Sequence, residues 1–336
     1  MAVVRTTETS SVCYINGKLA KTYVYVMPKT VLDSTTIIKE NTTWTAEKSP
    51  YYVPSGVQVA ANATLAIEAG AVVEGPRYMP CTGCVSTLVG TSPITNAGVI
   101  KIQGSQAQHV KLYSAGINNA QTGSVSIQYA DLFETPLPYS SAGKVVLLDS
   151  RVERANVLFS TEAGAQSFNA NGAPSVGRNG DIERNTFIDS AGFSFDASTT
   201  VKNNLFVSMA GPLTLSTGDL VYTPGTSPTE PAGYNWTPTN VTLNSFIFTS
   251  DNKNANRLAV TLYTTVGNCY SIGTSCSPYA FDMSNNYWGT VDNTVIMSRI
   301  ADKNNNVNIT GEIRFLPPLE APDRTTPTVS TAAAAN

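Results

Sequence analysis

Charged residues are scarce in this chain of 336 residues, and no part of it is expected to form a basic surface. Asp, Glu, Lys and Arg make up 13% of the sequence, about half of the ~25% that is typical of globular proteins. The formal net charge at pH 7 is −3. Because nucleic acids and anionic membranes attract clustered Lys and Arg, we expect neither as a partner.

Long apolar runs are also absent. No stretch approaches the ~18 consecutive apolar residues of a membrane span, so we expect no membrane-spanning segment. The opening residues, MAVVRTTETSS, lack the apolar centre of a secretory signal. Three routes therefore stay open: export by another pathway, a signal removed before numbering, or assembly inside a cell, as virion parts are assembled.

Metal-ligating and redox-active side chains are few. The chain has one histidine, His109, and five cysteines, Cys13, Cys81, Cys84, Cys269 and Cys276. The CxxC motif at 81–84 is compatible with a redox centre, half of a zinc site or a short disulfide loop. Since nothing helical follows it and no second ligand pair is present, we predict two local disulfides, within 81–84 and within 269–276, with free buried thiols as the alternative. No metal site is predicted.

Several enzyme motifs are missing as well. A serine or cysteine nucleophile needs a basic partner, and the chain has a single histidine and no G-x-S-x-G motif. No Gly-rich loop ending in Lys-Ser or Lys-Thr is present to hold a phosphate. We therefore expect neither a catalytic triad nor the use of a nucleotide.

Short alternating runs fill most of the chain. In VQVAANATLAIEAGAVVEG (57–75), apolar residues alternate with small or polar ones. Similar runs, separated by tight turns of small residues, follow as far as FDMSNNYWG (281–289). This pattern is typical of short β-strands rather than of helices.

Several of these runs are copies of one unit. The motif Asn-x-aromatic occurs at Asn185–Phe187, Asn204–Phe206, Asn244–Phe246 and Asn286–Trp288, with weaker versions at Ser150–Val152 and Ala130–Leu132. The last positions of the six copies are separated by 20, 35, 19, 40 and 42 residues. These gaps are close to one or two multiples of ~20 residues, the scale of a solenoid repeat.

Stacked coils explain why this unit recurs. Asparagine tolerates a left-handed turn and can bond to the amide one coil away, while the aromatic ring stacks inside the coil. We therefore interpret SNNYWGT (284–290) as a repeat in which Trp288 fills and closes one of the last turns. A sugar-stacking surface is the alternative.

The segment 42–75 resembles the opening of bacterial extracellular right-handed parallel β-helix proteins. Its sequence, TTWTAEKSPYYVPSGVQVAANATLAIEAGAVVEG, is similar to their WT-x-x-x-SPY segment followed by a first rung of the form V-x-V-x-x-x-ATL-x-IE-x-G-x-VV. SIQYADLF and NNYWG also resemble rungs of this pectate-lyase-like superfamily. The superfamily contains pectate lyases, polygalacturonases, phage tailspikes and adhesins, so the resemblance implies a fold and not a function.

We predict an all-β fold, a right-handed parallel β-helix of about 10–12 rungs over residues 41–316. Residues 1–40 match no later run and are predicted to be an N-terminal cap or assembly segment. The Pro- and Thr-rich residues 317–336 are predicted to be a flexible tail. Longer connections at 76–96, 161–180 and 218–237 are expected to project as loops.

A polysaccharide lyase or glycoside hydrolase is the enzymatic alternative. Such an enzyme needs an acid and a base, or a base with Ca²⁺ near a uronate. The candidate catalytic residues come from the densest charged stretch: Asp149, Glu153, Arg151 and Glu183. We favour the interpretation that they are solvated residues. Polygalacturonases carry NTD, DD, HG and RIK motifs that this sequence lacks, no motif supports Ca²⁺, and no cofactor is predicted.

The leading hypothesis is a non-catalytic structural or adhesion protein on a virion or cell exterior, presenting loops on a rigid rod. Open solenoid ends are edges that pair with another chain, so residues 1–40 and the tail are expected to mediate self-assembly into trimers or filaments. A third hypothesis is carbohydrate binding without turnover, with Tyr234, Trp236 and Trp288 as candidate binding residues. The expected partners are a surface glycan or other copies of the chain.

Overall fold

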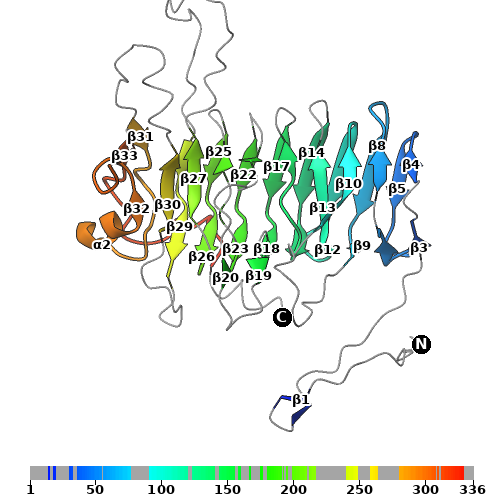
Figure 1. Ribbon diagram of the computed structural model, residues 1–336, viewed down its shortest axis with the longest axis horizontal. Coiled ribbons are helices and arrows are strands. Elements are labelled where there is room, and N and C mark those ends of the chain that lie inside the picture. Colours follow the sequence, from blue (N-terminus) through cyan, green and yellow to red (C-terminus); the bar gives the residue numbers. More distant parts are fainter. Residues whose placement is uncertain are drawn as a thin grey trace, which may run out of the picture.

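The computed structural model shows a rod of stacked β-strands (Figure 1). It describes residues 14–15, 18–19, 30–32, 36–54, 56–76, 91–119, 123–140, 144–155, 158–159, 166–167, 175–176, 180–190, 192, 194–195, 199–209, 212–216, 240–248, 258–263, 280–307, 309 and 312–328. All five cysteines, Tyr234 and Trp236 lie outside the described residues. The predicted disulfides and the binding role of the two aromatic residues therefore stay predictions.

Two large parallel sheets form two sides of the rod. The nine-stranded sheet contains β3 (Thr30–Val31), β6 (Tyr51–Tyr52), β9 (Val72–Glu74), β12 (Val110–Tyr113), β15 (Ala130–Phe133), β18 (Arg151–Glu153), β23 (Thr186–Ile188), β26 (Leu205–Val207) and β29 (Ser245–Ile247), in this order. The eight-stranded sheet contains β5 (Thr42–Trp44), β8 (Thr64–Glu68), β11 (Val99–Gln103), β14 (Ser124–Gln128), β17 (Val145–Leu148), β22 (Asp181–Glu183), β25 (Thr200–Lys202) and β28 (Asn240–Thr242).

Two five-stranded sheets complete the stack. One contains β4 (Ile37–Ile38), β7 (Val57–Val59), β10 (Thr91–Asn96), β13 (Ala115–Asn119) and β16 (Tyr139–Ser140). The other contains β21 (Ser175–Val176), β24 (Ser194–Phe195), β27 (Leu213–Ser216), β30 (Val260–Tyr263) and β32 (Ile300–Ala301), and its β21 contacts β16.

Four smaller groups of elements lie outside these sheets. They are the antiparallel pairs β1 (Tyr14–Ile15) with β2 (Lys18–Leu19) and β19 (Leu158–Phe159) with β20 (Gln166–Ser167), the parallel pair β31 (Ala280–Asp282) with β33 (Glu312–Arg314), and the helix α2 (Asn293–Ser298). Asp292 accepts the amide hydrogens of Thr294 and Val295 at the start of α2, and the helix buries Ile296.

The chain visits a five-stranded, the eight-stranded and the nine-stranded sheet in turn, and each such pass is called a coil below. Neighbouring strands in all these sheets are parallel and come from successive coils. The prediction of an all-β fold of stacked parallel strands is therefore confirmed, and the arrangement is consistent with a parallel β-solenoid. No helix among the described residues is long and apolar enough to cross a membrane.

The interior is built from side chains that recur at the same place in each coil. Phe187, Phe206, Phe246 and Trp288 stack in a row, with ring centroids 5.0, 5.0 and 4.7 Å apart. All four rings are at most 2% exposed. The predicted aromatic stack is confirmed, and it fills the coils because each ring has a partner on the next coil.

The predicted asparagine ladder is also present. Asn185, Asn204, Asn244 and Asn286 are 0% exposed, and the side-chain carbonyl of each of the last three accepts hydrogen bonds from the amides of the asparagine one coil earlier. Each follows a residue with a positive φ of 54° to 59°. Ser150 continues the ladder, because its N–H donates to Asn185 Oδ1 at 2.9 Å and its hydroxyl accepts from Ala130 N–H. The ladder is therefore confirmed, but the left-handed backbone belongs to the residue before each asparagine and not to the asparagine itself.

The stack extends further at its N-terminal end than the sequence indicates, and it includes two segments that were predicted to be loops. β3 and β4 pair in parallel with β6 and β7, so the coils begin at Thr30 rather than at 41. The loop predicted at 76–96 contains β10, which pairs with β7 and β13, and the loop predicted at 161–180 contains β20 and β21. The loop predicted at 218–237 lies outside the described residues.

Residues 317–328, predicted to belong to a flexible tail, are instead held against the coils. Pro317 O accepts from Asn285 N–H, and Leu319 N–H donates to Asn286 O. Thr326 is 3% exposed, and its hydroxyl donates to Leu243 O at 2.8 Å. The segment has no periodic pattern because its partners are turns far away in the sequence, and this correction therefore required the structure.

Candidate functional site

A hollow of about 880 Å³ opens on the outer face of the nine-stranded sheet. It is lined by Gly70, Val72, Gln106, Ala107, Gln108, His109, Lys111, Tyr129, Asp131, Asp149, Ser150, Arg151, Arg184, Thr186, Thr325 and Pro327. These residues come from successive coils and from the segment 317–328. The repeated coils and the segment 317–328, which folds back over them, therefore form the lining together.

The floor of the hollow is one row of side chains that are neighbours in register. Lys111 lies beside Val72 and Asp131, Asp131 beside Arg151, and Arg151 beside Thr186. They point outward because the alternate positions in these strands, such as Leu112 and Leu132, are buried in the core. Neighbouring strands lie ~4.8 Å apart, so an extended ligand along this row meets a new side chain at each coil.

One wall of the hollow is formed by turn residues with left-handed backbone. Tyr129, Asp149 and Arg184 have φ values of 50°, 48° and 54°. Each lies between a strand of the eight-stranded sheet and the next strand of the nine-stranded sheet. Repetition of the same turn brings these three side chains together although they are far apart in sequence.

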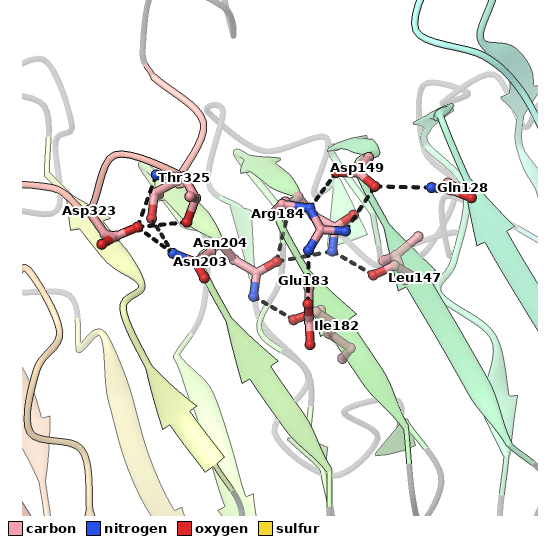
Figure 2. Close-up of polar contacts among 12 residues, drawn as sticks. Gln128, Leu147, Asp149, Ile182, Glu183, Arg184, Asn203, Asn204, Asp323 and Thr325 are labelled. Carbon is pink, nitrogen blue, oxygen red and sulfur yellow. Dashed lines mark hydrogen bonds and ion pairs between the residues drawn. The ribbon is translucent and has the colours of Figure 1, made fainter.

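Arg184 organises the charges in this wall. Its Nε and Nη2 donate to the two oxygens of Asp149 at 2.6 and 3.0 Å, and its Nη1 donates to Glu183 at 2.9 Å (Figure 2). Gln128 donates to the same Asp149 carboxylate at 3.2 Å. Hydrogen bonding to Asp149 raises the pKa of Arg184 despite its partial desolvation, with the charges of Asp149 and Glu183 acting in the same direction.

The four predicted catalytic candidates thus form ion pairs. Asp149 and Glu183 share Arg184, while Arg151 Nη2 donates to Glu153 at 2.8 Å. Asp149 and Arg151 line the hollow, whereas Glu153 and Glu183 are not part of its lining. The candidates lie close together on neighbouring coils, but their carboxylates are bound by guanidinium groups.

A second pair of polar side chains in the hollow was not predicted. His109 Nδ1 lies 2.9 Å from Asp131 Oδ1, and the two side chains are 28% and 29% exposed. The imidazole is tilted over the ring of Tyr129, with centroids 5.9 Å apart. Asp131 holds Nδ1, so the other ring nitrogen, Nε2, is available to a ligand.

A closer comparison of repeats could have found this pair. The run QHVKLY (108–113) aligns with QYADLF (128–133), and the structure pairs Val110 with Ala130 and Lys111 with Asp131. This alignment places His109 one coil from Tyr129 and beside the outward row that contains Asp131. The sequence therefore contained the evidence for this pair, because the two runs are copies of the repeat that lack the asparagine.

Lys111 is the exposed cation on the floor of the hollow. It forms no ion pair with any residue that the structure describes, whereas Arg151 and Arg184 both bind carboxylates. An ammonium group in this position is free to bind an oxygen of a ligand.

Trp288 contributes to the core and not to a surface. It is 2% exposed and its ring stacks on Phe246 at a centroid distance of 4.7 Å. The interpretation of SNNYWGT as a repeat is thereby supported, and Trp288 offers no face to a sugar.

The described residues include no group of three or more His, Cys, Asp or Glu side chains that could hold a metal ion. Comparison with protein-family models, curated proteins and solved structures finds no match. The chemistry of the site therefore follows from its own residues. It is an open groove that presents amide, imidazole, ammonium and phenol groups beside the paired charges of Asp149, Arg151 and Arg184.

Proposed function

We propose that the protein is a non-catalytic adhesion protein of a cell or virion exterior, which binds a surface glycan in the hollow. In this proposal the rod is a right-handed parallel β-helix of the pectate-lyase-like type. The observation that carries it is the pairing of charges: the carboxylates of Asp149, Glu183 and Glu153 are each bound by an arginine, while polar groups that suit hydroxyl-rich ligands face the hollow.

The lining favours a saccharide chain over an apolar ligand. Gln106, Gln108 and His109 supply planar donors and acceptors, Lys111 supplies a cation, and Tyr129 supplies a ring with a hydroxyl. A groove that is open along a row of equivalent positions suits a polymer, because each further unit of the polymer meets the side chain of the next coil.

The ion pairs argue against hydrolysis at this site. Glycoside hydrolysis needs one protonated carboxylic acid and one free carboxylate across the scissile bond. A bidentate arginine occupies both oxygens of Asp149. Asp149 therefore fits the role of a positioning group for Arg184 better than that of an acid.

The test is a glycan array probed with the full chain, followed by titration calorimetry of Lys111→Gln and of a matched control, Lys101→Gln. Lys101 is exposed on β11 of the eight-stranded sheet and does not line the hollow. We expect Lys111→Gln to weaken binding about tenfold, the loss of one charge-assisted hydrogen bond. We expect Lys101→Gln to have no effect, and the glycan to be recovered intact. Equal effects of the two variants, or an array without binders, would reject the proposal.

A second candidate function is a polysaccharide lyase or hydrolase that uses His109. The observation in its favour is the His109–Asp131 pair, because a carboxylate that holds Nδ1 orients the imidazole for proton transfer at Nε2. Incubation with the array binders would then release new chain ends, and His109→Gln would stop the release while Asp149→Asn would not. Glycans that stay intact with the unmodified protein would exclude this candidate.

Self-assembly is proposed to occur through the ends of the rod. The exposed large hydrophobic residues of the described part are Val31, Ile37, Val291, Val295, Met297, Val307 and Leu316, and all belong to the first or the last coils. Negative-stain electron microscopy with light scattering would distinguish trimers or filaments from single rods. Single rods at every concentration would contradict assembly and leave the binding proposal in place.

A further inference from the structure

The segment 317–328, called the strap below, runs back from the last coils over earlier ones (Figure 1). Its first residue, Pro317, bonds to Asn285 on one of the last coils. Asp323 and Thr326 bond to turns of earlier coils. Thr325 and Pro327 then line the hollow.

Beyond the hollow, the same row of outward positions continues along the nine-stranded sheet. After Thr186, the next residues in register are Leu205 and then Ser245. They point away from the core because Phe206 and Phe246, the adjacent positions, form the internal stack. Leu205 and Ser245 are nevertheless 2% and 0% exposed, whereas Lys111 on the open part of the row is exposed. The row is therefore open on one side of Thr186 and covered on the other.

The strap is anchored where the covered part begins. Asn203 Nδ2 donates to Asp323 Oδ1 at 2.9 Å, as Figure 2 shows beside Arg184. The carboxylate of Asp323 also accepts from the backbone and hydroxyl of Thr325, at 2.9 and 2.6 Å. The hydroxyl of Thr326 donates to Leu243 O at 2.8 Å, and Thr326 is 3% exposed. Both anchors bond to the turn that precedes a covered outward residue.

We propose that the strap is the end wall of the binding hollow and restricts it to the end of a saccharide chain. This inference rests on the proposed glycan binding. A chain that lies over Lys111, Asp131 and Arg151 meets Thr325 and Pro327 of the strap in the lining, and the outward residues that follow Thr186 in register, Leu205 and Ser245, are buried. In the opposite direction the sheet continues through β6 to its last strand, β3. The bound chain therefore terminates at the strap and leaves the rod at the end that contains β3.

The first experiment compares oligosaccharides prepared from the polysaccharide with the highest array signal. They are presented with both ends free, or coupled to a bulky protein through one end or through the other. We expect coupling through one particular end to reduce affinity at least tenfold, and coupling through the other end to have no effect. In the double variant Asp323→Ala/Thr326→Ala, which loosens both anchors, we expect the difference to fall below about threefold. Glu320→Ala, an exposed strap residue, is the matched control.

The rate of trypsin cleavage after Arg324 measures independently whether the strap is held against the coils, because Arg324 is exposed and lies between Asp323 and Thr325. We expect slow cleavage in the unmodified protein and in Glu320→Ala, and faster cleavage in the double variant. Addition of the oligosaccharide to the unmodified protein should leave the rate unchanged or lower it. A higher rate would show that the ligand displaces the strap, and would overturn the end wall.

The two proposals fail in different ways. An array without binders would reject both the proposal of glycan binding and the proposal that the strap is an end wall. Binding that is insensitive to coupling at either end would remove the end wall alone, and so would a double variant that keeps the preference of the unmodified protein although its strap is cleaved rapidly.

Discussion

Arg184 and Asp149, which lie 35 positions apart in the sequence, bind each other through two parallel hydrogen bonds of 2.6 and 3.0 Å. Both residues occupy the same left-handed turn position on neighbouring coils. The geometry is bidentate, which is the strongest form of a carboxylate–guanidinium contact. The pair therefore fixes the wall of the hollow and links two coils.

We predict that Asp149→Asn and Arg184→Gln each lower the free energy of unfolding by about 1–2 kcal/mol, a range discounted for the 37% exposure of the Arg184 side chain. The control is Lys144→Gln. Its ion pair with Asp181 spans 3.3 Å, with side chains 56% and 40% exposed, and we expect a loss below about 0.5 kcal/mol. Urea denaturation measures all three variants. A loss for Asp149→Asn no larger than that for Lys144→Gln would show that the pair contributes nothing.

Asn204 should be among the least replaceable residues of the chain. Its Oδ1 accepts from Asn185 N–H at 2.9 Å and from Asn185 Nδ2 at 3.0 Å, while its Nδ2 donates to Ile182 O at 2.8 Å and to Asn244 Oδ1 at 3.0 Å. Asn204→Ala leaves these buried groups without partners, at about 1–3 kcal/mol for each unsatisfied group. We expect a loss of at least about 3 kcal/mol in thermal or urea unfolding. Asn62→Ala, at an exposed position, should change the stability by less than about 0.5 kcal/mol; equal effects would contradict the ladder.

The internal aromatic stack should contribute to stability in proportion to the volume removed. Phe206 packs between Phe187 and Phe246, with both centroid distances at 5.0 Å. Phe206→Ala is expected to cost about 3–5 kcal/mol, because the rigid coils cannot collapse onto the cavity. Phe206→Leu should cost less, about 1–2 kcal/mol. Calorimetric melting would test the order, and a Leu variant no more stable than the Ala variant would argue against tight packing.

The strap should loosen in acid. Hydrogen bonds from the Thr325 hydroxyl, from the Thr325 amide and from Asn203 hold the pKa of Asp323 below its ordinary value of 3.8. Because this pKa is lower in the bound strap than in the free one, the stabilisation is present above pH 3.8 and is lost as the pH falls through the lowered pKa.

Hydrogen exchange of residues 317–328, corrected for intrinsic rates, measures this effect. We expect protection to decrease below pH 3.8 in the unmodified protein, by at most about tenfold per pH unit. In Asp323→Asn we expect weaker protection that no longer changes over this range. A pH profile that is identical in the two proteins would assign the acid sensitivity to another group.

The repeat could be predicted because it depends only on residues that are neighbours in the sequence. Asn185, Asn204, Asn244 and Asn286 each need a left-handed residue before them and an aromatic ring two positions later. These requirements involve only neighbouring residues and recur at each coil. The motif therefore indicated both the hydrogen-bond ladder and the ring stack, and Trp288 was correctly interpreted as part of the repeat.

The coils without asparagine were harder to interpret. A second ladder follows the nine-stranded sheet, where the hydroxyls of Thr135 and Ser190 accept from the N–H groups of Ala115 and Ala155 at 3.3 and 3.2 Å. Threonine and serine are too common in this sequence to mark such a turn. Ser150, which the sequence indicated as part of a weaker copy of the motif, does belong to the first ladder.

The strands of the repeated alternating runs, the asparagine ladder and the interior rings could be predicted from the sequence, because each depends on alternation and on preferences within a few residues. Only the tertiary structure decided which outward side chains meet. Lys111, Asp131 and Arg151 become one floor, and Arg184 reaches Asp149, because the register between coils sets the neighbours. The strap depends on the tertiary structure entirely, since its hydrogen bonds join residues such as Asn203 and Asp323, which lie 120 positions apart.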